Sequence, residues 1–304
     1  MILSFYRDFH DKTAIADWNR RERPSYDSIA VRPLSPVLGA EVEGVDLSKP
    51  LSDAQLVDIR KAIAAHLVLV FRDQEITAED HKRFARHFGT LHRHVLGGAR
   101  QLSSNDHDPE ILAWRTGPEA RYTAGDAWHS DVTCDPEPIW GSFLRVTKQP
   151  EIGGDTAFAN MYLAYDSLSE KVKALLDGLT AVHDGGKAWT AGYGATPQPG
   201  QTFPSTEHPV VARHHLTGRK YLFVNEAFTS HIVQLTRTES DAILGLLFRH
   251  IEKNLAFQAR IHWHPNTLVF WDNWATQHHA VWDYYPHERW GERASAFIGS
   301  APQP

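Results

Sequence analysis

Four short segments rich in apolar and aromatic residues follow one another near the C-terminus, and turn-forming residues separate them. They span 258–263, 267–271, 278–281 and 294–298. Short strand-like segments at this spacing are typical of a β-sandwich or barrel. We therefore predict a β core made of two sheets.

The rest of the chain adds more strands and only a few helices. Capping signatures at Ser52–Gln55 and Thr77–Asp80 predict helices that end near His66 and Phe88. Residues 238–254 have the apolar period of a helix, with Ile243, Leu246, Leu247 and Ile251 on one stripe. Further strands are expected at 29–31, 37–42, 67–71, 139–147, 179–183, 209–212 and 221–224. The predicted fold is mainly β with flanking helices.

Residues 185–209 stand apart because they hold four prolines and five glycines and show little periodicity. A segment of this length without regular structure is unusual inside a domain unless it has a function. We predict that it is an active-site lid. With no internal repeat in the sequence, we expect a single domain over residues 1–304.

The composition narrows the possible partners and the cellular compartment. A net charge of -6 argues against a nucleic-acid binder, which needs a basic surface. The single cysteine, Cys134, excludes a disulfide framework and zinc sites built on several cysteines. The N-terminus lacks a signal-peptide pattern, and the most apolar window, 62–71, is too short to span a bilayer. We expect a cytoplasmic protein that binds neither nucleic acid nor membranes.

His129 and Asp131, in the segment Trp-His-Ser-Asp, form the only His-x-Asp pattern in the chain. On an extended segment, side chains at i and i+2 project to the same face, so both can reach one ion. Two histidines and one carboxylate are the facial ligand set of non-haem Fe(II) oxygenases. The third ligand could be His262 or His264, or one of the adjacent pair His278 and His279, and spacing does not decide between them.

Arg289 and Arg293 lie downstream of these histidines and enter the last apolar strand. A guanidinium next to a buried strand is costly unless it meets an anion, and its planar fork matches a carboxylate or sulfonate. The pair predicts a small anionic ligand. The alternative is a surface ion pair with Glu288 or Glu292.

Five motifs in order resemble the taurine dioxygenase (TauD/TfdA) family over about residues 30–300. They are Trp-His-Ser-Asp-Val-Thr at 128–133, Gly-Gly-Asp-Thr at 153–156, Phe-Val-Asn-Glu-Ala-Phe-Thr at 223–229, Trp-Asp-Asn-x-x-x-Gln-His at 271–278, and the Arg289/Arg293 pair. The segments 38–47 and 71–74 look like the same family. This resemblance implies Fe(II)- and 2-oxoglutarate-dependent oxygenase chemistry on a double-stranded β-helix (jelly-roll, cupin-like) core.

The resemblance also implies roles for individual residues. His129, Asp131 and His278 would be the iron ligands, so His262, His264 and His279 would not. Arg289 and the Thr156 hydroxyl would bind the distal carboxylate of 2-oxoglutarate. With O2, the enzyme would hydroxylate a C–H bond and release succinate and CO2.

The implied substrate site consists of His94, the Val132 backbone, Trp189, Phe228 and Arg293. An anionic organic substrate is expected, such as a sulfonate, a sulfate ester, a phenoxy acid or an amino-acid-like compound. Three positions depart from the taurine pocket: Gly97 and Gly125 replace larger side chains, and Trp189 replaces a phenylalanine. They imply a reshaped pocket. We expect a homo-oligomer, dimer or tetramer, and the alternative function is a zinc hydrolase that uses the same three ligands.

Overall fold

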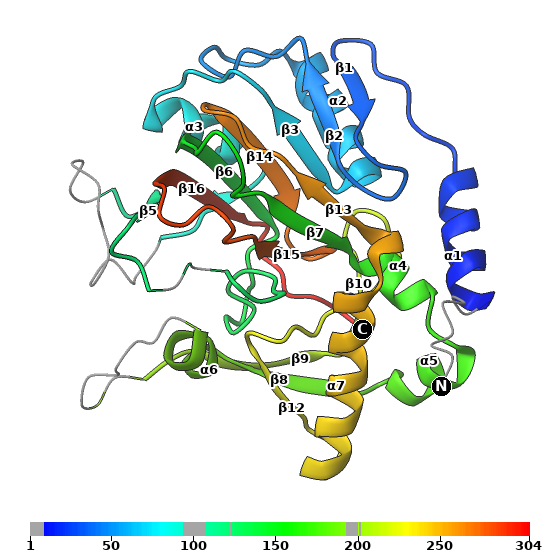
Figure 1. The fold of residues 1–304 in the computed structure, drawn as a ribbon. Helices are drawn as coiled ribbons and strands as arrows, with labels where there is room; N and C mark the ends of the chain where they lie inside the picture. Colours follow the sequence, from blue (N-terminus) through cyan, green and yellow to red (C-terminus); the bar gives the residue numbers. More distant parts are fainter. Residues whose placement is uncertain (1–8, 94–107, 122, 124, 193–199, 201) are drawn as a thin grey trace.

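The computed structural model describes residues 9–93, 108–121, 123, 125–192, 200 and 202–304. Its largest element is an eight-stranded sheet, drawn in the upper half of Figure 1. The strand order is β1 (Ala30–Pro33), β2 (Ala40–Glu43), β3 (Val68–Phe71), β14 (Thr267–Asp272), β6 (Gly141–Lys148), β16 (Arg289–Phe297) and β4 (Thr90–Leu91), with β5 (Leu112–Thr116) also on β16. Among the described strands, β2 and β3 are the one pair that runs in parallel.

A second sheet lies below the first in Figure 1 and completes the core. Its antiparallel strands are β13 (Gln258–Ile261), β7 (Thr156–Asn160) and β15 (Thr276–Ala280). The prediction of a mainly β fold with a two-sheet core is confirmed. The C-terminal strands are divided between the two sheets, so the chain crosses from one sheet to the other between them.

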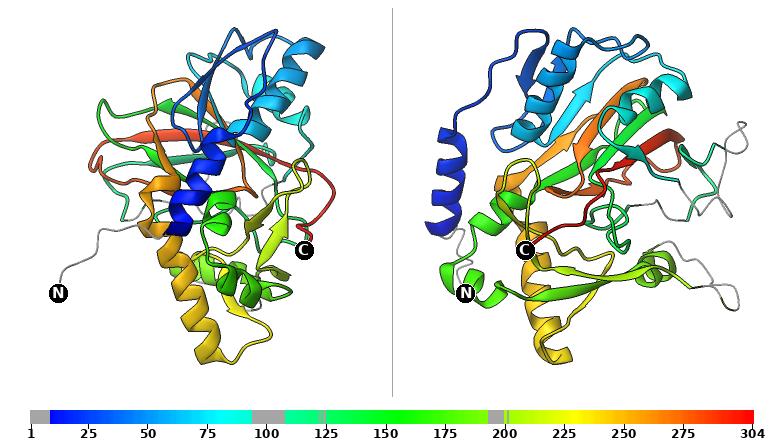
Figure 2. Two further views of the ribbon diagram at one scale, coloured as in Figure 1. Left: turned by 90° about the vertical axis from the view of Figure 1, so that its right-hand side faces the viewer. Right: turned by 180° about the vertical axis from the view of Figure 1, so that it is seen from behind.

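A smaller third sheet forms the lower part of the molecule. It contains β12 (Thr229–Ile232), β8 (Thr180–Asp184) and β9 (Ser205–Pro209), and helix α7 (Arg237–Lys253) packs beside it, as the two views of Figure 2 also show. The hairpin of β10 (Val211–Arg213) and β11 (Lys220–Leu222) follows β9 in sequence. The helices α4 (Met161–Asp166) and α5 (Glu170–Leu176) connect the second sheet to the third.

Helices α2 (Asp53–His66) and α3 (Ala78–Arg86) begin where the sequence predicted. Both have complete capping boxes. The Ser52 or Thr77 hydroxyl accepts the backbone N–H of the residue three positions later, and the side chain of that residue accepts the backbone N–H of Ser52 or Thr77. α3 covers the large sheet through an aromatic cluster of Phe84, Phe88, Phe143 and Phe270. Burying each such side chain contributes about 1.5–3 kcal/mol.

Two predictions from sequence need correction. Residues 185–209 are not one irregular segment: Gly185–Lys187 form α6, a π-helical turn covers Ala188–Gly192, and Ser205–Pro209 form β9, while 193–199 and 201 lie outside the described residues. In α7, Leu246 is exposed and Leu244 is buried instead. The buried stripe is therefore Ser240, Leu244, Leu247 and Ile251.

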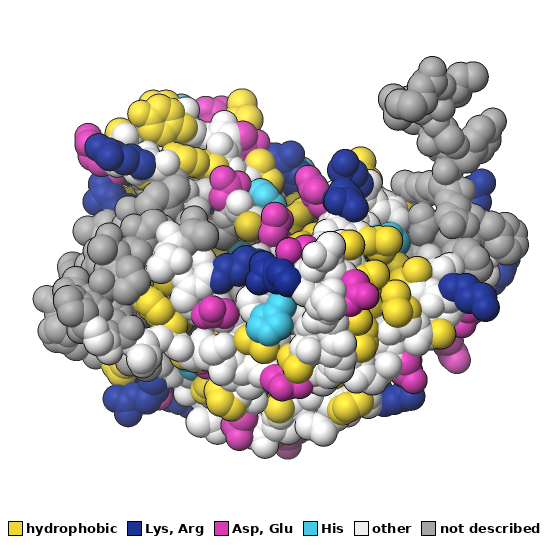
Figure 3. Space-filling model, turned by 90° about the horizontal axis from the view of Figure 1, so that it is seen from below, with side chains coloured by type: hydrophobic (Ala, Val, Ile, Leu, Met, Phe, Trp, Pro, Cys, Tyr) yellow, Lys and Arg dark blue, Asp and Glu magenta, His cyan; other side chains and the backbone are white. Residues whose placement is uncertain are grey.

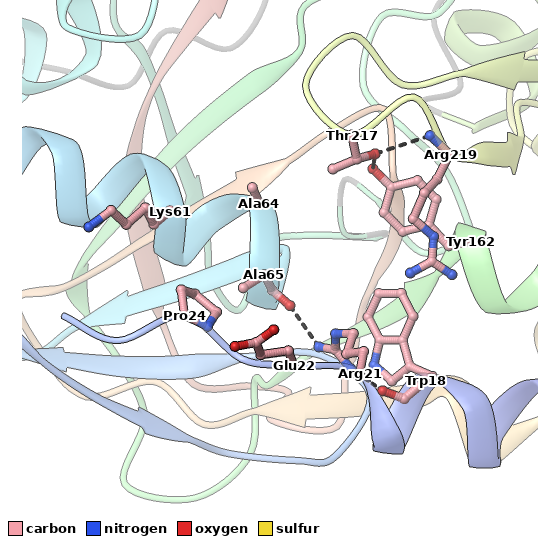
Figure 4. A pocket seen from close by; sticks show the side chains of 10 residues that line it. All are labelled: Trp18, Arg21, Glu22, Pro24, Lys61, Ala64, Ala65, Tyr162, Thr217 and Arg219. Atoms are coloured by element: carbon pink, nitrogen blue, oxygen red, sulfur yellow. Dashed lines mark hydrogen bonds between the residues drawn. The ribbon is translucent and has the colours of Figure 1, made fainter.

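Helix α1 (Phe9–Arg20) lies at the edge of the molecule, and an open groove of about 350 Å³ separates part of it from α2 and α4 (Figure 4). The Arg21 and Arg219 guanidinium groups both lie over the Trp18 ring, 3.7 and 4.5 Å from its centre. Arg21 also donates to the carbonyls of Trp18 and Ala65. These contacts hold α1 against the body of the protein.

Basic and acidic side chains are interspersed over the lower face of the molecule (Figure 3). None of the helices in the described part of the chain is long and apolar enough to cross a bilayer.

Candidate functional site

His129 and His278 lie directly opposite each other in the structure. The segment at His129 forms an isolated antiparallel bridge to β15, and the two residues exchange both backbone hydrogen bonds, at 3.1 and 2.8 Å. Their rings lie on the same side, with centres 4.1 Å apart. Backbone pairing thus brings together two imidazoles that are 149 positions apart in the sequence.

Asp131 lies beside these two rings. One carboxylate oxygen is 3.7 Å from His129 Nε2 and the other is 3.8 Å from His278 Nε2. Arg293 Nη1 donates to Asp131 Oδ1 at 2.6 Å, and Ser142 Oγ donates to Oδ2 at 3.3 Å. Burial opposes ionisation of this carboxyl, but Arg293 and the two histidines outweigh that effect and lower the pKa of Asp131.

The donor set suits a metal ion. One ligand atom from each of the three residues lies within 4.8 Å of the others, and all three side chains are buried. Burial lowers the pKa of both histidines, which favours the neutral form that binds metal. His129 Nδ1 lies 2.8 Å from the Ala127 carbonyl, so it carries the proton and leaves Nε2 free toward Asp131. Among the described residues this is the one such cluster found.

The other histidines considered from sequence lie elsewhere. His279, next to His278 on β15, points to the opposite side, where it contacts the Trp128 ring and lies 3.8 Å from Asp126. His262 is exposed and pairs with Asp155 at 2.9 Å. His264 is also exposed. None of the three is part of the cluster, as the resemblance implied.

Arg289 is buried in an environment that does not neutralise its charge. Its Nε donates to Gln149 Oε1 at 3.0 Å. The guanidinium lies 4.9 Å from the ring centre of Trp114 and 5.3 Å from that of Trp263. Nη2 is buried without a hydrogen-bond partner. Burial lowers the pKa of Arg289 to about 10. A buried cation with an unsatisfied donor is a ready site for an anion.

The surface ion pairs considered for these arginines do not form. Glu288 pairs instead with Arg115 and Lys148. Arg293 uses Nη1 for Asp131 and leaves its buried Nε unpaired. Both arginines therefore keep donor capacity toward the interior of the protein.

Gly154 lies against the Arg289 side chain, and Thr156 is linked to it through Trp263. The Thr156 hydroxyl accepts from Trp263 Nε1 at 3.0 Å, and this indole also faces Arg289. Gly153 and Gly154 form a turn with φ of 87° and 73°. A Cβ on Gly154 would lie 3.2 Å from Arg289 Cδ and 2.8 Å from Gln149 Nε2, so this position needs glycine for space as well as for backbone conformation.

An apolar wall adjoins the Asp131 loop. Phe228, Cys134 and Ala188 form a small buried cluster, and Val132, Trp189 and Ala227 pack against it. The wall thus unites three predicted substrate residues from three separate segments. Val132 has a φ of 53°, which is strained for a β-branched residue and is typical of functional sites.

Reasoning from sequence missed several residues of this region. Cys134 belongs to the wall, a placement that nothing in the sequence indicated. Gln149 and Asn273 contact site residues, but only long-range contacts reveal them. Gly125 lies against His129: an added Cβ would come within 3.1 Å of Cε1. His94 and Gly97 lie outside the described residues.

Comparison with known proteins identifies the family. A model described as taurine catabolism dioxygenase TauD, TfdA family matches residues 30–295. The chain belongs to this family. An alpha-ketoglutarate-dependent sulfonate dioxygenase of Saccharomyces cerevisiae is 32% identical over 296 residues, covering 92% of this chain and 70% of that protein. An alpha-ketoglutarate-dependent sulfate ester dioxygenase of Pseudomonas putida is 31% identical over 269 residues, covering 84% of each chain.

A solved structure of the same family agrees with the fold. The crystal structure of a taurine dioxygenase from Burkholderia xenovorans superposes with a TM-score of 0.76 and 36% identity, covering 91% of each chain. The predicted family and its jelly-roll core are confirmed. The protein is therefore a 2-oxoglutarate-dependent dioxygenase, an oxidoreductase.

Proposed function

We propose that this dioxygenase uses Fe(II), O2 and 2-oxoglutarate to hydroxylate a C–H bond of a small organic anion, such as a sulfonate or a sulfate ester. The observation that carries the proposal is the convergence of His129, Asp131 and His278 in one buried cluster. Iron held there would supply dioxygen activation coupled to the decarboxylation of 2-oxoglutarate to succinate. The names of the relatives support a sulfur-containing anion.

The roles in binding 2-oxoglutarate and substrate follow from hydrogen-bond donors that have no partner within the described part of the protein. Arg289, with its unpaired Nη2, binds the distal carboxylate of 2-oxoglutarate, and the Thr156 hydroxyl adds a donor beside it. Arg293, four residues along β16, meets the anionic head of the substrate through its free Nε. Four residues of extended strand span about 13 Å, enough to separate two anions. His94 contributes to the same head-group site.

The body of the substrate lies against the apolar wall. Val132, Trp189 and Phe228, with Cys134 and Ala188, favour a hydrocarbon body over a charged one because burying an unpaired charge there would be costly. This chemistry favours alkyl or aryl anions over taurine, whose ammonium would need a polar partner. The part of segment 185–209 that precedes β9 acts as a lid, anchored by Lys187 Nζ, which donates to the carbonyls of Glu226 and Thr229 at 2.6 and 2.7 Å.

The proposal is tested first without oxygen. Anaerobic addition of Fe(II) and 2-oxoglutarate should give the weak visible charge-transfer band of this class of site. His278→Ala should lose the band, whereas the matched neighbour His279→Ala should keep it. A colourless wild-type complex, or hydrolysis that depends on zinc alone, would favour the zinc hydrolase.

A second experiment identifies the substrate. Succinate release is measured with hexyl sulfate, hexanesulfonate, phenoxyacetate, taurine and amino acids, each against the background without substrate. Release above background with hexyl sulfate or hexanesulfonate is expected. A response to taurine alone would contradict the apolar assignment of the pocket. The expected homo-oligomer is measured separately by light scattering.

A further inference from the structure

Asn225 is buried at the start of the turn that carries Phe228. Its side-chain Oδ1 accepts a hydrogen bond from the Phe228 backbone N–H at 2.9 Å. The backbone N–H of Asn225 donates to Thr229 Oγ1 at 2.9 Å. Because the Phe228 N–H can only donate, the side-chain oxygen must face the turn and the NH2 group must face away from it. The orientation of the Asn225 amide is thus determined by its partner.

The Asn225 NH2 group points to the loop that contains Asp131. Nδ2 donates to Thr133 Oγ1 at 3.1 Å. Thr133 is fully buried, and its hydroxyl also lies 2.8 Å from Nδ1 of His183 on β8. One asparagine side chain therefore bonds both the Phe228 turn and the loop that carries Asp131.

Two further bonds tie this loop to the third sheet. Thr206 Oγ1 donates to the Cys134 carbonyl at 2.8 Å, and His208 Nε2 lies 3.0 Å from the Asp135 carbonyl. Thr206 and His208 are both on β9, and these two hydrogen bonds do not involve the Phe228 turn. Of these hydrogen bonds, the one made by Asn225 links the loop to the Phe228 turn.

We propose that Asn225 is a positioning residue that sets the distance between the Phe228 turn and the Asp131 loop, and so holds the substrate C–H in place for oxidation. This inference rests on the proposed function. Misplacement of a reacting group by about 1 Å can cost about 100-fold in rate. Arg289 and Thr156 lie on other strands, so loss of Asn225 should leave 2-oxoglutarate binding unchanged.

The first test measures the link itself by amide hydrogen exchange on the full-length protein. Asn225→Ala should raise exchange in both 131–135 and 226–229. Thr133→Val keeps the Asn225–Phe228 bond, yet it should also raise exchange in 226–229 because the turn loses its bond to the loop. Ser240→Ala removes a buried bond to Ile232 on the same sheet and should alter neither segment. Exchange that rises only in 131–135 in Thr133→Val would overturn the proposal.

The second test measures coupling with hexyl sulfate as the probe. Wild type should form about one succinate per hexyl sulfate consumed, whereas Asn225→Ala should form roughly threefold more succinate per product and show a higher KM for hexyl sulfate. The KM for 2-oxoglutarate should change less than about twofold. If the KM values for hexyl sulfate and 2-oxoglutarate rose equally in Asn225→Ala, its role would be merely structural and the proposal would be overturned. A wild type that ignores hexyl sulfate would refute that substrate class, and the exchange experiment would still decide the role of Asn225.

Discussion

Asn273 bonds to both sides of Asp131. Its Oδ1 accepts the Asp131 amide at 2.8 Å, and its Nδ2 donates to the Asp131 carbonyl at 3.0 Å and to the Ile139 carbonyl at 2.9 Å. Asn273 is fully buried in the turn between β14 and β15, three residues before β15 begins its pairing. The strand of His278 and the loop of Asp131 are thereby held in register.

Replacing Asn273 with alanine should weaken metal binding about 10- to 100-fold, the usual effect of losing a residue that orients metal ligands. It should also cost about 1–3 kcal/mol of unfolding free energy, because buried backbone groups lose their partners. Mn(II) titration and urea unfolding measure the two effects. Gln74→Ala is the matched control: Gln74 also bonds one N–H and two carbonyls, but at Leu47, Val45 and Arg72. Loss of metal affinity in both variants would contradict a specific role.

Replacing Arg289 with alanine should raise the KM for 2-oxoglutarate about 10- to 100-fold, because a charge-assisted bond contributes about 1.5–3 kcal/mol. Arg289→Lys should recover little, since a lysine cannot form the planar fork. Initial rates of succinate formation against 2-oxoglutarate concentration measure the effect. Arg115→Ala removes a nearby exposed guanidinium and should change nothing; an unchanged KM in Arg289→Ala would exclude the assigned role.

Gly154→Ala should combine backbone strain with displacement of the Arg289 side chain. The φ of 73° costs about 1 kcal/mol for alanine, and the new Cβ would crowd Gln149 and Arg289. We expect lower stability together with a several-fold higher KM for 2-oxoglutarate. Gly178 has the same φ and no neighbour within 4 Å, so Gly178→Ala should lose stability only. Equal KM values in the two variants would argue against crowding at Arg289.

Stability should decrease as the pH falls below about 6.5, in part because of His81. This ring is fully buried, its Nε2 bonds the Phe143 carbonyl at 2.9 Å, and burial lowers its pKa to about 4. Between these two pH values the unfolded chain binds a proton at His81 that the folded protein does not. The contribution of His81 to the free energy of unfolding is therefore fully present above pH 6.5 and is lost progressively toward pH 4. The slope is about 1 kcal/mol per pH unit. Urea unfolding of His81→Gln from pH 7.5 to 5 should give a shallower slope than wild type, and parallel curves would refute this.

Cys134 should be unreactive in the folded protein. It is fully buried, and burial raises its pKa to about 12, so the thiolate fraction at pH 8 is about one in ten thousand. A disulfide reagent such as DTNB should label about one thiol per chain in urea and far less than one in native buffer. Fast labelling of native protein would mean that the apolar wall opens.

Local patterns predicted the elements whose partners are near in sequence. The capping boxes at Ser52 and Thr77 form within four residues, so the sequence contains both halves of each interaction. His129 and Asp131 lie together, as their i and i+2 spacing predicted, but the extended segment is short: His129 forms an isolated bridge to β15, and Asp131 already lies in a turn. The choice of His278 over His279 needed the resemblance to a family, because alternation allows either residue to face inward.

Elements that are stabilised by partners distant in the sequence were not predicted from it. β9 looked like part of a loop because Ser-Thr-Glu-His-Pro has no strand period, yet its backbone pairs with β8. In α7, helical geometry allowed both Leu244 and Leu246 near the apolar stripe, and packing against the third sheet selected Leu244.

The sequence by itself determined the fold class, because strand periodicity and caps are local. Its motifs determined the family and, through that resemblance, the choice of His278 as the third residue of the metal cluster. Only the tertiary structure decided that Arg289 bonds Gln149, that Asn273 bonds Asp131, and that Cys134 lines the wall. These pairings join residues far apart in the sequence that the packing of strands and loops brings together. Long-range packing is set by the whole chain at once, and no local pattern encodes it.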